Sequence, residues 1–412
     1  MKETNKKAKF FKKKLKNGMT VIFEERKNSG VVSVAFGLRC GAVNESKAEK
    51  GISHFIEHML FKGTNKRNSK QISEEIEKQG GMMNGFTEEE LTFYTCKMPS
   101  HKIHVALEVL SDMIKNPAFD EKELNKERQV IFEELKLYRD NPRLWIHDNL
   151  HSCLFSGSAG MNLGGTEETL NSIDRKKMIK KFNQVYTANS LILCVVGDAT
   201  LKKLCDYCEK NFKKAQGKIP EQRVGQIVKK KIEERKGIDQ ANLALAFHVP
   251  PAFNKDNYAS QVLSCIIGGG MSSRLWQEIR EKRNLAYSIS SNCTSGKRFG
   301  YITVLAGTSP QNVEKIKELI ILEFGKVARE LGEKELNQAK EQLIGNSRIS
   351  REDSSGQMLD LLCNEIWGDA KKSYEYEKMI KAVKLCDVKR IASKVKEGNY
   401  SFLALIPEDG KR

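Results

Sequence analysis

The chain has 412 residues, of which 39% are hydrophobic and 30% charged, and its formal net charge at pH 7 is +17. This length is sufficient for more than one ordinary domain. No run of about 18 apolar residues occurs, so we expect no membrane-spanning helix. The lysine-rich segment 1–16 is not followed by a continuous apolar segment, and a secretory signal peptide is therefore not expected.

The ten cysteines show no framework spacing. In a chain of this size they predict free thiols, and with them a cytoplasmic location. The C-x-x-C pattern from Cys205 to Cys208 has no second pair nearby. We expect these two thiols to pack on one helix face.

The positive charge raises the alternative of a nucleic-acid-binding protein. The excess lysines are, however, spread along many predicted helices and loops, and no recognised nucleic-acid module is present. A solvated basic surface is the simpler interpretation, and no nucleic-acid partner is expected.

Strand and helix patterns alternate through the first half of the chain. Strands are predicted at 19–25, 31–38 and 191–197, and helices at 53–60, 69–79, 99–114, 121–138 and 201–213. The stretch 82–97 is strand-like, and Asn84-Gly85 within it predicts a turn or an irregular edge. The polar, lysine-rich segment 217–237 predicts a linker.

The segment 53–60 carries the first chemical signal. On a helix, His54 and His58 are one turn apart and share a face, and Glu57 lies beside that face. Such a pair can hold one metal ion while the carboxylate handles a water proton. The order His-x-x-Glu-His is the inverzincin signature. The five-residue pattern alone leaves open an ordinary helix with two exposed or hydrogen-bonded histidines. Ser46 to Glu49 resembles a capping box for this helix.

The predicted helix 121–138 carries the second signal. One stripe of this helix contains Glu127, Val130, Ile131, Glu134 and Tyr138. Because unpaired buried carboxylates are costly, two carboxylates in an apolar stripe predict a cation nearby. The neighbouring Glu133 points about 100° away from Glu134 and is the weaker candidate. The alternative is that both glutamates of the stripe lie at its edge and reach water.

The second half of the chain repeats the first. The segment beginning at Leu243 matches that at Val32, an offset of 211 residues (243 − 32). Glu333 to Asn337 matches Glu121 to Asn125, an offset of 212 (333 − 121). Similar offsets in strands and helices predict a duplicated domain.

The repeat lacks the chemical residues. His54, Glu57 and His58 fall against the three positions Cys265, Gly268 and Gly269. In the same way, Glu134 falls against Asn346. This joint loss favours a chemical role for these residues over a purely structural one.

Together, the segment His54 to Thr64, the pattern Glu127 to Glu134 and the duplication resemble the pitrilysin/insulinase family of zinc peptidases. The resemblance is greatest to the two-domain branch that includes mitochondrial processing peptidase. It implies an α+β fold of two homologous α/β-sandwich domains, with mostly antiparallel sheets covered by helices, closing like a clam shell. We therefore expect a zinc-bearing domain at 1–216, a linker at 217–237 and a homologous domain without metal at 238–412.

The resemblance also assigns roles to the motif residues. It implies one Zn²⁺ per chain, bound by His54, His58 and Glu134. Glu57 is then the catalytic base that activates the zinc-bound water. Glu127 is expected to support the site from outside the ligand set.

Further residues are expected to contact substrate. By resemblance, Asn84, Gly85 and Phe86 lie on an edge strand that binds an extended peptide. Gly85 departs from the alanine usual at its position. Arg280 and Tyr287 match an arginine and a tyrosine that hold substrate or stabilise the developing oxyanion. Without the resemblance, an exposed helix arginine and a core strand tyrosine would be the simpler interpretation of these two.

The expected function is that of a zinc metalloendopeptidase acting on short or unfolded polypeptides. The resemblance implies that each active site needs a zinc-bearing half and a half without metal, and we expect a homodimer. The alternative within the same fold is a non-catalytic partner or scaffold protein.

Overall fold

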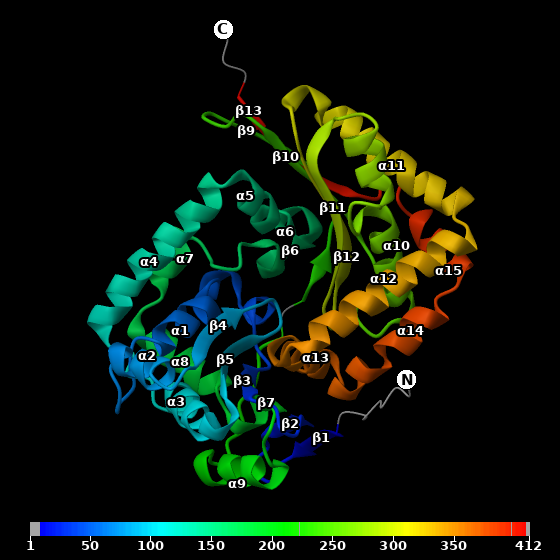
Figure 1. The fold of residues 1–412 in the computed structure, drawn as a ribbon. Coiled ribbons are helices and arrows are strands. Elements are labelled where there is room, and N and C mark those ends of the chain that lie inside the picture. Colours follow the sequence, from blue (N-terminus) through cyan, green and yellow to red (C-terminus); the bar gives the residue numbers. More distant parts are fainter. Residues whose placement is uncertain (1–8, 222, 397, 409–412) are drawn as a thin grey trace. The chain divides into compact units, whose positions relative to one another are not determined.

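The computed structural model describes residues 9–221, 223–396 and 398–408 (Figure 1). The chain divides into two compact units, and each is discontinuous in sequence. The first unit comprises Met1–Glu133, Leu163–Gln222 and Ile349–Ser373. The second comprises Glu134–Asn162, Arg223–Arg348 and Tyr374–Arg412.

The first unit is built on a six-stranded sheet of order β1-β2-β7-β3-β5-β4. The strands are β1 (Lys9–Lys14), β2 (Thr20–Glu25), β3 (Val31–Leu38), β4 (Met82–Thr87), β5 (Thr92–Pro99) and β7 (Leu191–Gly197). The central strand β7 is buried throughout, as its apolar sequence predicts. The pair β2–β7 is parallel and the other pairs are antiparallel.

Helices contact both faces of this sheet. Helices α1 and α3 contact β5, and α13 contacts β3 and β7. A Cβ atom on Gly37 of β3 would lie 2.6 Å from a methyl carbon of Leu362, so α13 packs directly on the strand. The helices of this unit are α1 (Ile52–Leu60), α2 (Ser69–Glu77), α3 (Ile103–Lys115), α7 (Glu167–Ser172), α8 (Arg175–Val185), α9 (Leu201–Asn211), α13 (Ser354–Trp367) and most of α4 (Glu121–Asp140).

The second unit is built on a five-stranded sheet of order β11-β12-β10-β13-β9. Its strands are β9 (Lys230–Arg235), β10 (Ala241–His248), β11 (Ala286–Ser295), β12 (Gly300–Thr308) and β13 (Ser401–Pro407). A short pair, β6 (Phe155–Ser156) and β8 (Gly225–Gln226), lies apart from this sheet. The helices are α5 (Pro142–Asn149), α6 (His151–Leu154), α10 (Lys255–Gly268), α11 (Val313–Glu330), α14 (Tyr376–Ala382), α15 (Leu385–Ala392) and most of α12 (Glu333–Glu352).

The two sheets have the same topology. Five strands of the first sheet, β2-β7-β3-β5-β4, correspond in order to β9-β13-β10-β12-β11 of the second. The parallel pair β2–β7 corresponds to the parallel pair β9–β13. Helices α4 and α12 have equal lengths and keep the offset of 212 residues (333 − 121). The predicted α+β fold with a duplicated, mostly antiparallel sheet is confirmed.

The repeats exchange a helix. Helix α5 follows α4, and α13 follows α12 at the same offset of 212 residues (354 − 142). Helix α13 contacts β3 and β7 of the first sheet, while α5 contacts their counterparts β10 and β13 in the second. The sequence predicted two contiguous domains, at 1–216 and 238–412. That division stays a prediction.

Two local predictions were wrong. Residues 230–235 of the expected linker form β9, an edge strand that pairs with β13. Its alternating exposed and half-buried residues explain the linker-like composition, because an edge strand can remain polar. Asn84-Gly85 is neither a turn nor an irregularity: both residues lie within the edge strand β4, in regular pairing with β5.

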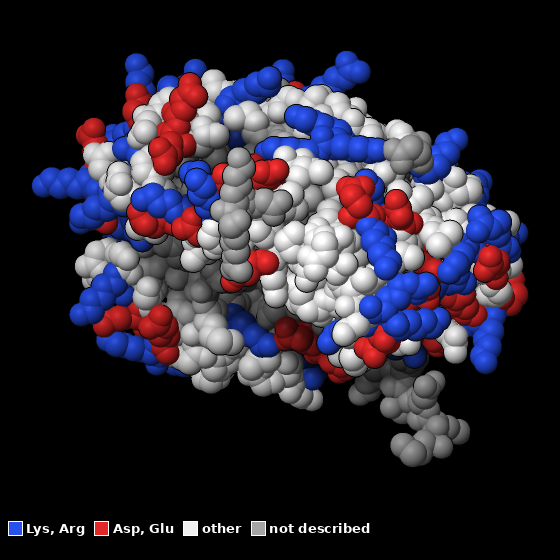
Figure 2. Space-filling model, turned by 90° about the horizontal axis from the view of Figure 1, so that it is seen from above, with Lys and Arg blue, Asp and Glu red and all other residues white. Residues whose placement is uncertain are grey.

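Charges of both signs are mixed on the face of the molecule that Figure 2 shows. In the face shown in Figure 2, lysine and arginine are dispersed, with aspartate and glutamate between them. Among the described residues, no helix combines the length and apolar character needed to cross a bilayer.

Candidate active site

Helix α1 carries both motif histidines, and a buried carboxylate caps its start. The helix begins at Ile52, directly after Gly51, whose φ is +91°. The Glu45 side chain accepts hydrogen bonds from the backbone N–H groups of Gly51 (3.0 Å) and Ser53 (2.7 Å). These bonds satisfy donors that a helix N-terminus leaves open. The position of α1 is therefore fixed from outside its own sequence.

The capping box expected at Ser46 to Glu49 was wrong as a cap for α1. Lys47–Glu49 forms a separate 3₁₀ turn, and the Ser46 hydroxyl donates to the Glu49 carboxylate. The left-handed conformation of Gly51 separates this turn from the helix.

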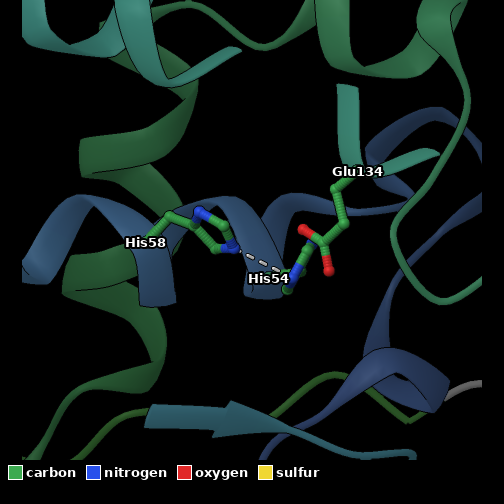
Figure 3. Close-up of side chains that lie close together, drawn as sticks. All are labelled: His54, His58 and Glu134. Atoms are coloured by element: carbon green, nitrogen blue, oxygen red, sulfur yellow. Dashed lines mark hydrogen bonds between the residues drawn. The ribbon is translucent and has the colours of Figure 1, made fainter. Parts of the chain in front are cut away.

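Three side chains converge into a group with metal-binding geometry. The Nε2 atoms of His54 and His58 are 3.1 Å apart. One ligand atom from each of His54, His58 and Glu134 lies within 4.8 Å of the others (Figure 3). Two imidazole nitrogens and a carboxylate oxygen form a donor set that suits zinc and leaves one tetrahedral position open. The residues present therefore fit the metal that the motif predicts.

Glu134 reaches this group from helix α4. The helix is continuous from Glu121 to Asp140, and the border between the compact units falls within it, after Glu133. Glu134 is half-buried, whereas Glu133 is exposed. The choice of Glu134 over Glu133 is thus consistent with the fold. Val130, predicted on the same apolar stripe, is 49% exposed, and that part of the prediction was wrong.

Glu127 orients one of the histidines. Its Oε1 atom lies 2.9 Å from Nδ1 of His58, and its Oε2 atom lies 2.7 Å from Nζ of Lys62. Burial alone would raise the pKa of Glu127, but the hydrogen bonds from His58 and Lys62 bring it below its usual value. An ionised Glu127 favours the proton on Nδ1 of His58, which leaves Nε2 available to a metal. Lys62, at the end of the motif segment, was not predicted as a site residue.

The protonation of His54 also suits metal binding. Burial lowers the pKa of His54 to about 3, and His58 contributes to the shift. The imidazole is therefore neutral near pH 7, which is the form that binds metal.

Glu57 lies between α1 and the edge strand β4. It is buried, and its Oε2 atom accepts a hydrogen bond from the Thr87 hydroxyl at 3.1 Å. A Cβ atom on Gly85 would lie 2.8 Å from the other oxygen, Oε1. The glycine that departs from the usual alanine thus leaves space that this carboxylate occupies. Thr87 is a second residue that the sequence did not single out.

The strand β4 presents the predicted substrate-binding residues. It is the last strand of the first sheet, so one of its sides is not paired within that sheet. Asn84 is exposed, and Phe86 is 43% exposed. The Asn84 side chain accepts a hydrogen bond from the backbone N–H of Gly85 at 2.9 Å. Open strand edges of this kind can pair with an extended peptide.

Arg280 and Tyr287 both belong to the second unit. Arg280 lies in a π-helical turn, Trp276–Glu281, with its guanidinium 4.0 Å from the Trp276 ring centroid. Such turns are frequent at functional sites. Arg280 is half-buried, so the alternative of a simple exposed arginine does not describe it.

Tyr287 lies at a bulge. The pairing of β11 with β12 shifts between Ala286 and Ser288, and bulges redirect a side chain. Tyr287 is 42% exposed, so the alternative of a core tyrosine was wrong. A Cβ atom on Gly307 would lie 2.2 Å from the Tyr287 hydroxyl oxygen, and the glycine thus leaves room for the ring.

Comparison with known proteins agrees with this architecture. Residues 20–167 match the family model for insulinase (peptidase family M16), and residues 172–343 match that for the peptidase M16 inactive domain. The uncharacterized zinc protease YmxG of Bacillus subtilis (strain 168) is 33% identical over 399 residues, which cover 96% of this chain and 97% of the relative. The chain belongs to the insulinase family of peptidases, family M16.

Other members of the M16 family are similar over most of their length. The mitochondrial-processing peptidase subunit beta of Blastocladiella emersonii is 27% identical, over 92% of this chain and 84% of the relative. The crystal structure of a protease from Helicobacter pylori has the same fold, with a TM-score of 0.90 at 23% identity. The match covers 97% of this chain and 100% of the Helicobacter chain.

The match to an inactive domain agrees with the repeat pattern. In the part of the chain that the structure describes, the group of His54, His58 and Glu134 is the one set of potential metal ligands found. Helix α10, the counterpart of α1, carries Cys265 and Gly268 where α1 carries His54 and Glu57.

Proposed function

We propose that this M16 family member is a zinc-dependent endopeptidase that cleaves short or unfolded polypeptides. The observation that carries the proposal is the convergence of His54, His58 and Glu134, with the buried Glu57 on the same helix as both histidines. The proposed content is one Zn²⁺ per chain, held by these three ligands.

The chain's own residues would divide the chemistry among them. Zinc held at this site supplies Lewis acidity to the peptide carbonyl and to a water molecule. Glu57 accepts the proton of the attacking water and returns it to the leaving amine. Glu127 holds the ring of His58 through Nδ1. Arg280 and Tyr287 are proposed to hydrogen-bond the substrate or its developing oxyanion.

The proposed substrate lies along strand β4. Main-chain hydrogen bonds to an open strand edge depend little on sequence, which suits an extended peptide. Asn84, Gly85 and Phe86 are the proposed contacts. A folded protein cannot present a free extended segment easily, so the substrates are expected to be short or unfolded.

We also propose a cytoplasmic homodimer. All ten cysteines are free thiols, and seven of them are buried, which suits a reducing compartment. The dimer follows from the family resemblance, and light scattering on the purified chain tests it, because a fully active monomer would contradict it.

The peptidase proposal is tested with a diverse pool of unfolded peptides. Wild-type protein loaded with zinc should cleave them, and a chelator should abolish cleavage. Glu57→Gln should lose at least about 100-fold in kcat, because general acid–base catalysis contributes about that much, while it still binds zinc. A zinc-loaded wild type that leaves the whole pool intact would overturn the proposal.

The ligand assignment has a matched pair of variants in adjacent residues. Glu134→Gln should lose both zinc and activity, and Glu133→Gln should retain both. Zinc is measured by atomic absorption after dialysis. The opposite result would show that Glu133 is the ligand.

A further inference from the structure

We propose that Lys62 is a positioning residue for the metal-binding histidine His58 and that it acts through Glu127. The inference rests on the zinc site proposed above. It assigns Lys62 no contact with substrate or metal.

The contacts form a short chain of three side chains. Lys62 follows the end of α1 and lies one helical turn beyond His58 in sequence. Its Nζ atom is 2.7 Å from Oε2 of Glu127, and the other oxygen of Glu127 is 2.9 Å from Nδ1 of His58. The Glu127 carboxylate thus bridges a histidine and a lysine of one chain segment.

Because Glu127 is buried, its carboxylate depends on both of its partners for stability. Its side chain is 6% exposed, whereas that of Lys62 is 29% exposed. A buried carboxylate is stable only when its oxygens have partners. When the Lys62 ammonium is removed, Oε2 loses its ion pair. Rotation of the carboxylate toward other donors or water then lowers its free energy. The rotation would release the His58 ring from the orientation that aims Nε2 at the metal.

The direction in which zinc affinity changes when Lys62 is replaced distinguishes a positioning role from a simple charge effect. A lysine ammonium near a dication repels it, so charge alone predicts that removing Lys62 strengthens zinc binding. Positioning predicts the reverse. The two explanations therefore differ in direction and not only in size.

The experiment measures zinc affinity by competition with a chromophoric chelator. Lys62→Met keeps the length and apolar stem of the side chain and removes the charge. Its zinc dissociation constant should rise about 10- to 100-fold, the range for partners that orient metal ligands. Lys62→Arg should stay within about threefold of wild type, because it can still pair with Glu127. Lys66→Met removes the same charge from a nearby exposed position and should match wild type.

A double variant tests whether the effect passes through Glu127. Glu127→Gln should weaken zinc binding, and adding Lys62→Met to it should have little further effect. Unchanged or tighter zinc binding by a folded Lys62→Met protein would overturn the proposal, as would full additivity of the two changes. Circular dichroism checks the fold, and Lys62→Gln replaces Lys62→Met if that variant fails to fold.

The outcome can be separated from that of the proposed function. If wild type binds zinc without cleaving peptides, the peptidase proposal fails, and the Lys62 variants still decide the inference. If wild type binds no zinc, the metal site and the inference are overturned together.

Discussion

Both oxygens of the Glu57 carboxylate lie against strand β4. Thr87 donates a hydrogen bond to one oxygen at 3.1 Å, and the missing side chain of Gly85 leaves room for the other. The same strand is the proposed substrate edge. Gly85 and Thr87, which adjoin the proposed base, therefore alternate along this strand with Asn84 and Phe86, which are proposed to contact the peptide.

We predict that Thr87→Val lowers kcat. A hydrogen bond to a charged group contributes about 1.5–3 kcal/mol, so the loss should be about 10-fold or more with KM little changed. Thr87→Ser should restore most of the activity, because it keeps the hydroxyl. The measurement is steady-state kinetics on a fluorogenic peptide with zinc content checked for each variant.

Thr95→Val is the matched control for this prediction. Thr95 is half-buried on the neighbouring strand β5, opposite Asn84 in the register, and the same change there should leave kcat within about twofold, because Glu57 takes its hydrogen bond from Thr87. If Thr87→Val kept the wild-type kcat, the Thr87 hydroxyl would have no part in placing Glu57.

At the level of elements, the entry into helix α1 depends on two glycines that face each other. Gly51 has a φ of +91°, and its Cβ position lies 2.4 Å from the Gly164 carbonyl oxygen. Gly165 has a φ of +85°, and its Cβ position lies 2.5 Å from the Lys50 carbonyl oxygen. Gly51 directly precedes α1, so a side chain at either glycine would push the two backbones apart at the start of the helix that carries His54 and His58.

We predict that Gly51→Ala destabilises the protein strongly. A left-handed alanine costs about 1–2 kcal/mol, and the contact with a backbone oxygen adds to this cost. Gly157→Ala is the control, because Gly157 also has a positive φ (+73°) but no atom within 4 Å of its Cβ position. Urea unfolding should show a larger loss for Gly51→Ala. Equal losses would mean that the close approach contributes nothing.

The segment after α1 is tied to α3 by Asp112. This carboxylate accepts hydrogen bonds from Thr64 (2.6 Å), Arg67 (2.8 Å) and Asn116 (2.8 Å). Burial alone would raise its pKa, but these bonds, with the charge of Arg67, place the pKa below the usual 3.8. Because the folded pKa is depressed, the stabilisation is present above the unfolded pKa and is lost as pH falls through the folded value.

We therefore predict a pH-dependent cost for Asp112→Asn. At pH 7 the variant should lose about 1–3 kcal/mol of unfolding free energy. The difference from wild type should stay constant down to about pH 5 and narrow as pH falls below 3.8. Urea titrations across this range measure it. A difference that grows as pH falls would contradict the ion-pair explanation.

At the level of the whole molecule, each sheet is completed by a helix from the other half of the chain. The core of the first unit includes Met358, Leu361 and Leu362 of α13 packed with Ile22 and Ile192. Polar contacts fasten the same helix, since Glu365 pairs with Arg39 at 2.7 Å and with Lys12 at 2.6 Å. The first repeat alone therefore lacks part of its core.

We predict that the isolated segment 1–216 does not fold stably. Without α13 it exposes apolar strand residues such as Ala35 and Val196, which are buried in the whole chain. Fusing residues 349–373 to its end should restore solubility and cooperative unfolding. Circular dichroism and size-exclusion chromatography compare the two proteins. A soluble, cooperatively unfolding 1–216 would show that the predicted contiguous domain is sufficient.

Local patterns were enough to predict the site's central residues. His54, Glu57 and His58 lie within one helical turn or so, and Glu134 shares a helix with Glu127, so periodicity and repeat comparison could place them. Lys62 and Thr87 could not be found in this way. Each acts on a residue of another element, Lys62 on Glu127 and Thr87 on Glu57, and an ordinary surface lysine or strand threonine has the same local sequence.

From the sequence alone, helical spacing singled out His54, His58 and Glu134 as candidates, and the repeat offsets predicted the duplication, because both signals lie in short segments of the chain. Their proposed roles as metal ligands and the α+β class came from the family resemblance. Only the tertiary structure decided that α5 and α13 pack on the sheet of the other repeat, that residues 230–235 form a strand, and that Asn84-Gly85 lies within strand β4. The physical reason is common to all three. A polar edge strand, or an amphipathic helix, gains its stability from the sheet it joins, and its own residues do not specify which sheet that is.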